Sequence, residues 1–169
     1  FVLDGMHTTR LDEFDTALAS LNPDIVFIYD DEFNYLTKMC LTNMRSAAIH
    51  MIHQARTKQV PVFVYSSDAT DHKELYLKAG CDGIIIGEGE SVMLDILRVG
   101  GNIQSEQPLL GLFRQHDTRS ENTTRRGLTL DLDSLPAPDF SLLDMKLYQN
   151  EWLEYHGYFS INISTSRGC

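Results

Sequence analysis

The stretch VPVFVYSSDATDHKELYLKAGCDGIIIGEGE (residues 60–90) decides the fold. It opens with an apolar run rich in branched side chains (60–67), continues through a helix-like segment that Gly80 ends, and reaches a second apolar run (83–87). Runs that are apolar at nearly every position are typical of strands covered on both faces. A strand, a helix and a strand in this order predict a parallel βαβ unit.

The same alternation extends in both directions from this stretch. Upstream, DIVFIYD (24–30) is another apolar run, and a helical pattern from about Asn34 to Lys58 separates it from the next strand. Earlier still, FVLD (1–4) is short and apolar and precedes an amphipathic segment, while ESVMLDILRVGG closes the region with a further helix. We therefore expect residues 1–101 to form an α/β domain of four strands and four helices, a doubly wound parallel sheet of the flavodoxin-like or Rossmann-like type.

After Gly101 the pattern changes. PLLGLFRQHD and RRGLTLDLD are short strand candidates around a polar loop, and LPAPDFSLLD carries two prolines without a helical period. We expect residues 102–157 to form a hairpin and a linker, with a short helix in MKLYQNEWLEYHG. The final alternating run, 158–165, predicts the first strand of a further domain, of which 158–169 is the beginning. Both ends of the chain are expected to continue in a longer protein.

The amino-acid composition limits the kinds of partner and the cellular compartment that we expect for this chain. With 24 acidic and 14 basic residues the formal net charge is −10, which argues against nucleic acid and against an anionic membrane surface. No run of about 18 apolar residues is present, so we expect no membrane span. Three widely separated cysteines (Cys40, Cys81 and Cys169) do not form a disulfide framework and favour a reducing cytoplasm.

The loops after the expected strands carry the candidate functional residues. In an open parallel sheet, ligands bind outside the carboxyl ends of the strands. These loops read DGMH, DDEFNY, SSDAT and GEGE. The glycines of GEGE permit close backbone approach at the start of a helix, where amides can meet a polar ligand. Each of these residues also has a structural interpretation that needs no ligand. Glu88 and Glu90 would interact favourably with the helix dipole, and one hydroxyl of Ser66, Ser67 or Thr70 would cap the helix. Acidic residues at the end of a strand are commonly surface residues.

Histidines and two of the cysteines have structural interpretations. His50 and His53 share a helix face but lack cysteines or acids at ligand spacing, so a metal site there is the lesser alternative. Cys40 falls in the apolar stripe of its helix and is expected in the core. Cys81 follows the glycine that ends a helix and is expected to be structural.

One resemblance is to bacterial response-regulator receiver domains. NPDIVFIYD followed by VPVFVYSSDATDHKELYLKAGCDGIII is similar to that family, in which Asp30 would be phosphorylated and Ser66 would supply the switch hydroxyl. Gly87 stands where the family has a lysine after its last strand, and the acidic pair after its first strand is not found. A receiver-like domain is therefore kept as an alternative.

A second resemblance covers nearly the whole chain. SSDATDHKELYLKAGCDGIIIGEGE resembles the end of the cobalamin-binding domain of cobalamin-dependent radical S-adenosylmethionine (SAM) enzymes. LDLDSLPAPDFSLLDM resembles the segment that joins that domain to the radical SAM barrel, and YFSINISTSRGC resembles the first strand of the barrel running into the motif C-x-x-x-C-x-x-C. The three segments follow one another in the order of the family.

This resemblance implies a set of cofactors and ligands. Cys169 would be the first of three thiolates that hold a 4Fe-4S cluster, which binds SAM in the full-length parent. Cobalamin would lie over the strand ends, and DGMH has the wrong spacing for a lower-axial histidine, so we expect none from the protein. The partner of the domain would be its own radical SAM barrel, and the fragment alone is expected to bind rather than catalyse. The residues expected at the cobalamin are Asp30, Asp31, Asn34, Tyr65, Ser66, Ser67, Gly87, Glu88, Gly89 and Glu90.

A third hypothesis keeps the fold without the cofactor. Tyr65 and Ser66 stand where the family commonly has two glycines. The domain would then be an interaction or substrate-gating module.

Overall fold

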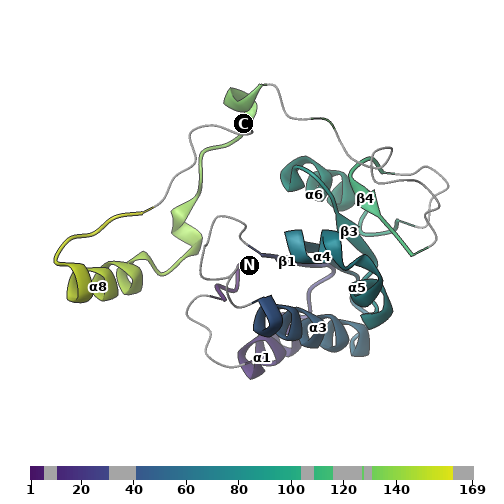
Figure 1. Cartoon of the computed structure of the whole chain (residues 1–169), viewed down its shortest axis with the longest axis horizontal. Helices are drawn as coiled ribbons and strands as arrows, with labels where there is room; N and C mark the ends of the chain where they lie inside the picture. The colour runs from purple at the N-terminus through teal and green to yellow at the C-terminus, as the bar shows by residue number, and fades with distance from the viewer. Residues whose placement is uncertain (6–10, 31–40, 104–108, 116–126, 128–130, 162–169) are drawn as a thin grey trace.

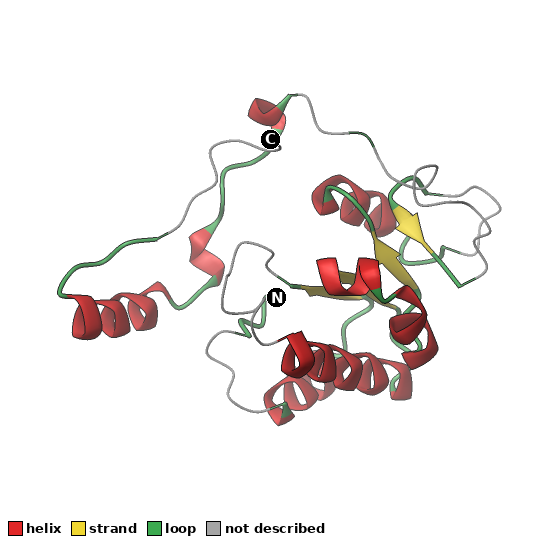
Figure 2. Cartoon of the chain, viewed as in Figure 1, coloured by secondary structure: helices red, strands yellow, loops and turns green. Residues whose placement is uncertain are grey.

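The computed structural model describes residues 1–5, 11–30, 41–103, 109–115, 127 and 131–161. Within them the chain is an α/β protein with one open four-stranded sheet flanked by helices (Figures 1 and 2). The strands are β1 (Val26–Tyr29), β2 (Val62–Tyr65), β3 (Gly83–Ile85) and β4 (Leu112–Phe113). The helices are α1 (Asp12–Leu21), α3 (Leu41–Thr57), α4 (Ser67–Asp71), α5 (Lys73–Ala79), α6 (Gly89–Arg98) and α8 (Met145–His156), with 3-10 turns η1 (Leu132–Ser134) and η2 (Phe140–Leu142).

The sheet is mixed, and this corrects the expectation of a wholly parallel one. Its order is β1-β2-β3-β4, with β1, β2 and β3 parallel, as predicted, and β4 antiparallel to β3. β4 comes from PLLGLFRQHD, which was expected in a separate hairpin and instead pairs Leu112 with Ile85. Antiparallel pairing here brings Leu112 over Gly83, where an added Cβ would lie 2.6 Å from the Leu112 Cδ1 atom. Glycine therefore makes room for the returning chain.

Helices cover both faces of the sheet. On one face α1 packs against α3 and α3 packs against α5, whereas α6 packs on the opposite face against β3. Alternate residues of β2 point to the two faces, because Val62 and Val64 belong to the core beneath α3 and α5, and Phe63 belongs to the core beneath α6. This two-sided burial explains the uninterrupted apolar runs.

Residues 1–4 form no strand in the structure, which corrects the expectation for FVLD. Phe1 is 87% exposed, and no strand of the described part pairs with this segment. A lone extended segment has no neighbour to satisfy its backbone groups, so its apolar composition alone does not make it a strand. Asp4 instead accepts a 2.5 Å hydrogen bond from the Tyr148 hydroxyl of α8.

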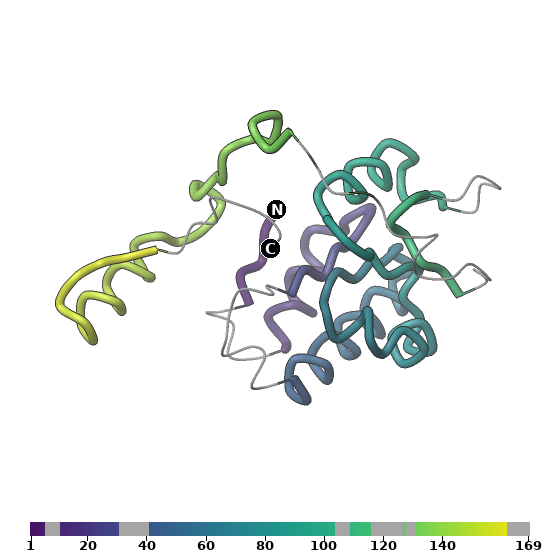
Figure 3. The backbone as a smooth tube through the Cα atoms, turned by 45° about the horizontal axis from the view of Figure 1, so that its top comes forward, coloured from purple at the N-terminus to yellow at the C-terminus, as the bar shows by residue number. Residues whose placement is uncertain are grey.

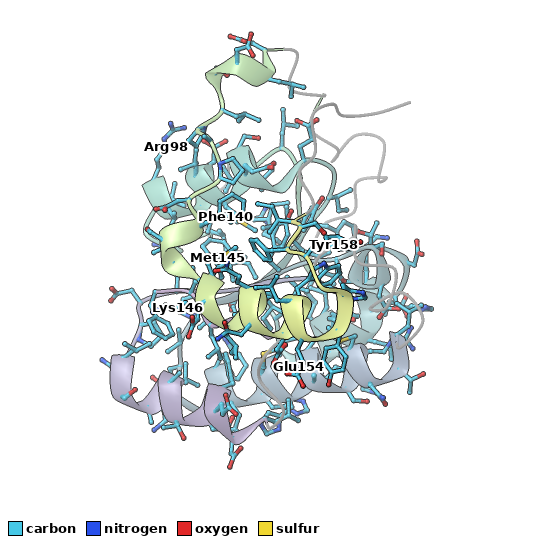
Figure 4. All side chains as sticks on the ribbon, turned by 90° about the vertical axis from the view of Figure 1, so that its left-hand side faces the viewer. Arg98, Phe140, Met145, Lys146, Glu154 and Tyr158 are labelled. Carbon is cyan, nitrogen blue, oxygen red and sulfur yellow. The ribbon has the colours of Figure 1, made fainter. Side chains whose placement is uncertain are left out.

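The segment predicted as a short helix near the end of the chain is α8. Asp144 caps it by accepting from the Leu147 amide at 3.1 Å, and Gly157 ends it with a φ of +75°. None of its residues is buried, and it stands apart from the α/β core in Figures 1 and 3 and in front of it in Figure 4. Residues 158–161 have no strand structure, and the rest of the predicted terminal strand, with Cys169, lies outside the described residues.

None of the helices in the described part of the chain has both the length and the apolar character that crossing a membrane requires.

Candidate functional site

The candidate site is the edge where the three parallel strands end. β1 and β2 end at the same level of the sheet, where the Asp30 amide donates a hydrogen bond of 2.9 Å to the Tyr65 carbonyl. Helix α4 starts directly after β2, and the GEGE turn leads from β3 into α6. The fold therefore gathers Asp30, the Tyr65–Ser67 segment and the GEGE turn at one edge, as the parallel strands predicted.

An aromatic pair lies at this edge beside a glycine. The rings of Tyr29 and Tyr65 stack with centroids 4.7 Å apart, and Tyr29 is 55% exposed. A Cβ added at Gly89 would lie 3.1 Å from the Tyr65 ring, so the ring rests directly on the backbone at the start of α6. Tyr29 was missed in the sequence because it falls inside an apolar strand, where an aromatic residue looks like core.

The GEGE turn joins β3 to α6 through an unusual backbone. Gly87 has a φ of +89°, a conformation that residues with a side chain rarely adopt. Glu88 is extended and does not cap α6 with its side chain, and Glu90 lies in the first turn, where its charge favours the helix dipole. The glycines therefore set the backbone conformation of the turn, and the favourable interaction with the helix dipole is enough to explain Glu90.

The two serines after β2 have different environments. Ser66 is buried, and its hydroxyl oxygen accepts from the Ala69 amide at 2.8 Å, which makes it the N-cap of α4. The Thr70 hydroxyl donates to the Ser66 carbonyl at 3.0 Å. Ser67 is exposed. Of the predicted hydroxyls, Ser66 thus has the structural role that capping implied, and Ser67 is the one presented at the surface.

A partly buried ion pair that the sequence did not reveal joins the helices next to this edge: Asp68 is buried, and Arg45 is 28% exposed. Asp68 accepts from Arg45 Nε at 2.7 Å and Nη2 at 2.5 Å, and also from the Tyr76 hydroxyl at 2.6 Å. Hydrogen bonds from Arg45 hold the pKa of the Asp68 carboxyl below its usual value, against the opposing effect of burial. Burial, followed by the contact with Asp68, raises the pKa of Tyr76 above its ordinary value. The three side chains bind α3, α4 and α5 together.

This ion pair predicts a loss of stability in acid. A carboxyl whose folded pKa is depressed stabilises the fold above its unfolded pKa of about 3.9, and the stabilisation disappears as the pH falls through the lower folded pKa. We expect the difference in unfolding free energy between the native chain and Asp68→Asn to be constant near neutral pH and to shrink below about pH 4. Urea unfolding at a series of pH values measures it. A difference that stays the same in acid would contradict the assignment.

Other ionisable groups have local roles. The Nε2 atom of His50 lies 2.9 Å from Oδ1 of Asp15, and this contact joins α3 to α1. Cys81 is buried, and burial raises the pKa of its thiol to about 12, which fits the structural role expected for it. Asp31, Asn34 and Cys40 lie outside the described residues, as does Cys169.

Two surface hollows lie away from the strand ends. One is lined by Pro61, Asp82 and the loop 100–103, and the other by residues 71–75 and Phe113. Neither is lined by a residue expected at the cobalamin.

Comparison with known protein families, with curated proteins and with solved structures finds no significant match to this chain.

Proposed function

We propose that this chain binds cobalamin at the carboxyl ends of β1, β2 and β3, as the cofactor domain of a radical SAM enzyme. The observation that supports this best is the stacked Tyr29–Tyr65 pair resting on Gly89. A partly exposed aromatic stack offers a flat apolar surface on which a large planar ligand could lie. Cofactor sites in open α/β sheets lie at this edge.

The residues of this chain would position the cofactor. Gly87 would allow the ligand to approach the backbone, the exposed Ser67 would offer a hydroxyl, and Tyr29 with Tyr65, whose ring packs on Gly89, would form the apolar support. When bound, cobalamin supplies methyl-transfer or redox chemistry, which belongs to the cofactor rather than to the fold. The contacts of Asp31 and Asn34, and Cys169 as a 4Fe-4S ligand, remain predictions of the same proposal.

A second candidate is a domain of the same fold that binds no cofactor. The observation that favours it is the position of the Tyr65 ring, which already fills the space in front of Gly89. Under this hypothesis the tyrosine pair is a plug rather than a support, and the edge serves as a contact surface for another part of the protein.

Titration with hydroxocobalamin distinguishes the two candidates. We expect saturable uptake of one cobalamin per chain, weakened at least about ten-fold by Gly89→Val, because the branched side chain would push against Tyr65. Gly127→Val is the matched control, since nothing lies within 4 Å of the Cβ position at Gly127. Absorbance after gel filtration measures the uptake, and circular dichroism verifies that each variant is folded.

The variant Tyr65→Gly tests the role of the ring. If Tyr65 supports the cofactor, this variant binds more weakly than the native chain. Uptake by Tyr65→Gly alone would show that the ring is a plug and would support the second candidate. Lack of stoichiometric uptake by both proteins would eliminate cobalamin.

A further inference from the structure

Helix α6 carries apolar side chains on two opposite sides. Gly89, Val92 and Ile96 are buried, so they mark the side of the helix that packs against the sheet. At about 100° per residue, Leu94 lies at the centre of the opposite side and Leu97 lies about 60° from it. The two leucines are 53% and 50% exposed. α6 is therefore apolar on its solvent side as well as on its core side.

The longest helix of the described part, α3, has the usual pattern instead. After its first turn, its exposed side chains are all polar: Ser46, His53, Arg56 and Thr57. A surface helix typically carries polar residues on the side away from the core. Single exposed apolar residues are common on protein surfaces, but neighbouring ones indicate a contact surface. The solvent side of α6 is such a surface.

The charged residues around Leu94 are arranged for self-association. Glu90 lies four residues before Leu94 and Arg98 four residues after it, so the three residues form one row along the helix. If two α6 helices pair antiparallel with Leu94 on a two-fold axis, Glu90 of each copy lies opposite Arg98 of the other. In a parallel pair, like charges would meet instead. The row is therefore self-complementary in the antiparallel arrangement alone.

Both charged side chains can reach a second copy. Arg98 points outward from α6 and is 73% exposed, although it donates to Asp95 of the same helix at 2.7 Å (Figure 4). The guanidinium has five N–H donors, so a second carboxylate can bind beside Asp95. Glu90 is half-buried and has a contact within its own chain, but a carboxylate accepts more than one hydrogen bond. Pairing between copies therefore does not require either charge to leave its present contact.

We propose that the solvent side of α6 binds a second copy of this chain, in an antiparallel α6 pair with Leu94 at the two-fold axis. Leu94 of both copies would meet at the centre beside Leu97, and the ion pairs between Glu90 and Arg98 would lie at the rim. The formal net charge of −10 opposes the approach of two copies, and a helix of 10 residues gives a small contact. We therefore expect a weak dimer that forms as the protein is concentrated.

Sedimentation velocity of the chain without cobalamin, over a range of protein concentrations, tests the proposal. We expect a reversible monomer–dimer equilibrium that Leu94→Glu weakens at least about ten-fold, because the new charge would face its own copy across the axis. Leu75→Glu is the matched control, since Leu75 is 46% exposed on α5, on the opposite face of the sheet. This variant should dimerise like the native chain, and circular dichroism verifies that each protein is folded.

Charge reversal tests the antiparallel arrangement. Glu90→Arg and Arg98→Glu should each weaken the dimer, because either change places like charges opposite each other. An equimolar mixture of the two variants should form a heterodimer, in which every contact again joins an acid to a base. This recovery distinguishes the proposed pair from damage to α6 by either substitution.

The outcomes are distinct. A native chain that stays monomeric at all concentrations would overturn the proposal, and α6 would then face a different partner. A dimer that Leu94→Glu leaves unchanged would overturn it too, because the contact would lie elsewhere on the molecule. If the charge variants dimerise no better mixed than apart, the antiparallel pair is wrong.

Discussion

Replacing Asp68 by alanine is expected to lower the free energy of unfolding by about 2 kcal/mol, less than breaking a fully buried ion pair, because the Arg45 side chain is 28% exposed. The side chain of Asp68 is only 5% exposed and accepts hydrogen bonds from both Arg45 and Tyr76. Its removal leaves the Tyr76 hydroxyl buried without an acceptor and the guanidinium without its partner. Urea unfolding at neutral pH measures the change.

Asp71→Ala is the matched control. Asp71 lies in the same short helix, α4, but is exposed, so its replacement should change the unfolding free energy by no more than about 0.5 kcal/mol. Tyr76→Phe, combined with Asp68→Ala in a double-mutant cycle, isolates the hydroxyl-to-carboxylate bond. Equal stability of the Asp68 and Asp71 variants would show that the ion pair contributes nothing.

Gly83→Val is expected to destabilise the protein by about 2 kcal/mol, as overpacking of a well-packed core does. A Cβ at Gly83 would lie 2.6 Å from Leu112 Cδ1 and 3.3 Å from the Phe113 carbonyl oxygen. Valine at this position therefore drives β4 away from β3. The unfolding free energy from urea titration is again the measurement.

Leu112→Ala tests whether Gly83→Val destabilises the protein by crowding the Leu112 side chain. Leu112 is 1% exposed, and its truncation alone should cost about 2–5 kcal/mol. In the double variant the valine occupies space that the leucine leaves, so the combined loss should be clearly smaller than the sum of the single losses. Strict additivity would mean that Gly83 and Leu112 do not compete for the same space.

The α/β alternation could be predicted because its signal is local. The apolar runs became β1, β2 and β3, and the Gly80 stop signal ends α5 with a φ of +108°. The role of Leu112 and Phe113 could not be predicted, because pairing with β3 depends on which sheet edge is open when the chain returns. The misassigned segment FVLD illustrates the same limit: composition indicates that a segment suits a strand, but a strand also needs a neighbour.

The sequence predicted where the candidate site lies, but not which of its residues contact one another. The rule for parallel sheets located the edge formed by Asp30, Tyr65 and the GEGE turn. It could not reveal that Tyr29 stacks on Tyr65, because exposure at the end of a strand depends on what covers that edge. Nor could it pair Arg45 with Asp68, which lie 23 positions apart on different helices.

The strand order has a consequence for how the chain folds. Each described strand pairs with the next one along the chain, from β1 to β4. Every pairing therefore closes only the helix or loop between two consecutive strands, and the loop-closure entropy of each step stays small. The paired residues still lie tens of positions apart, as Val26 and Val62 do, so we expect this sheet to form more slowly than a helical bundle. The strand order nevertheless allows the sheet to grow strand by strand as the polypeptide leaves the ribosome.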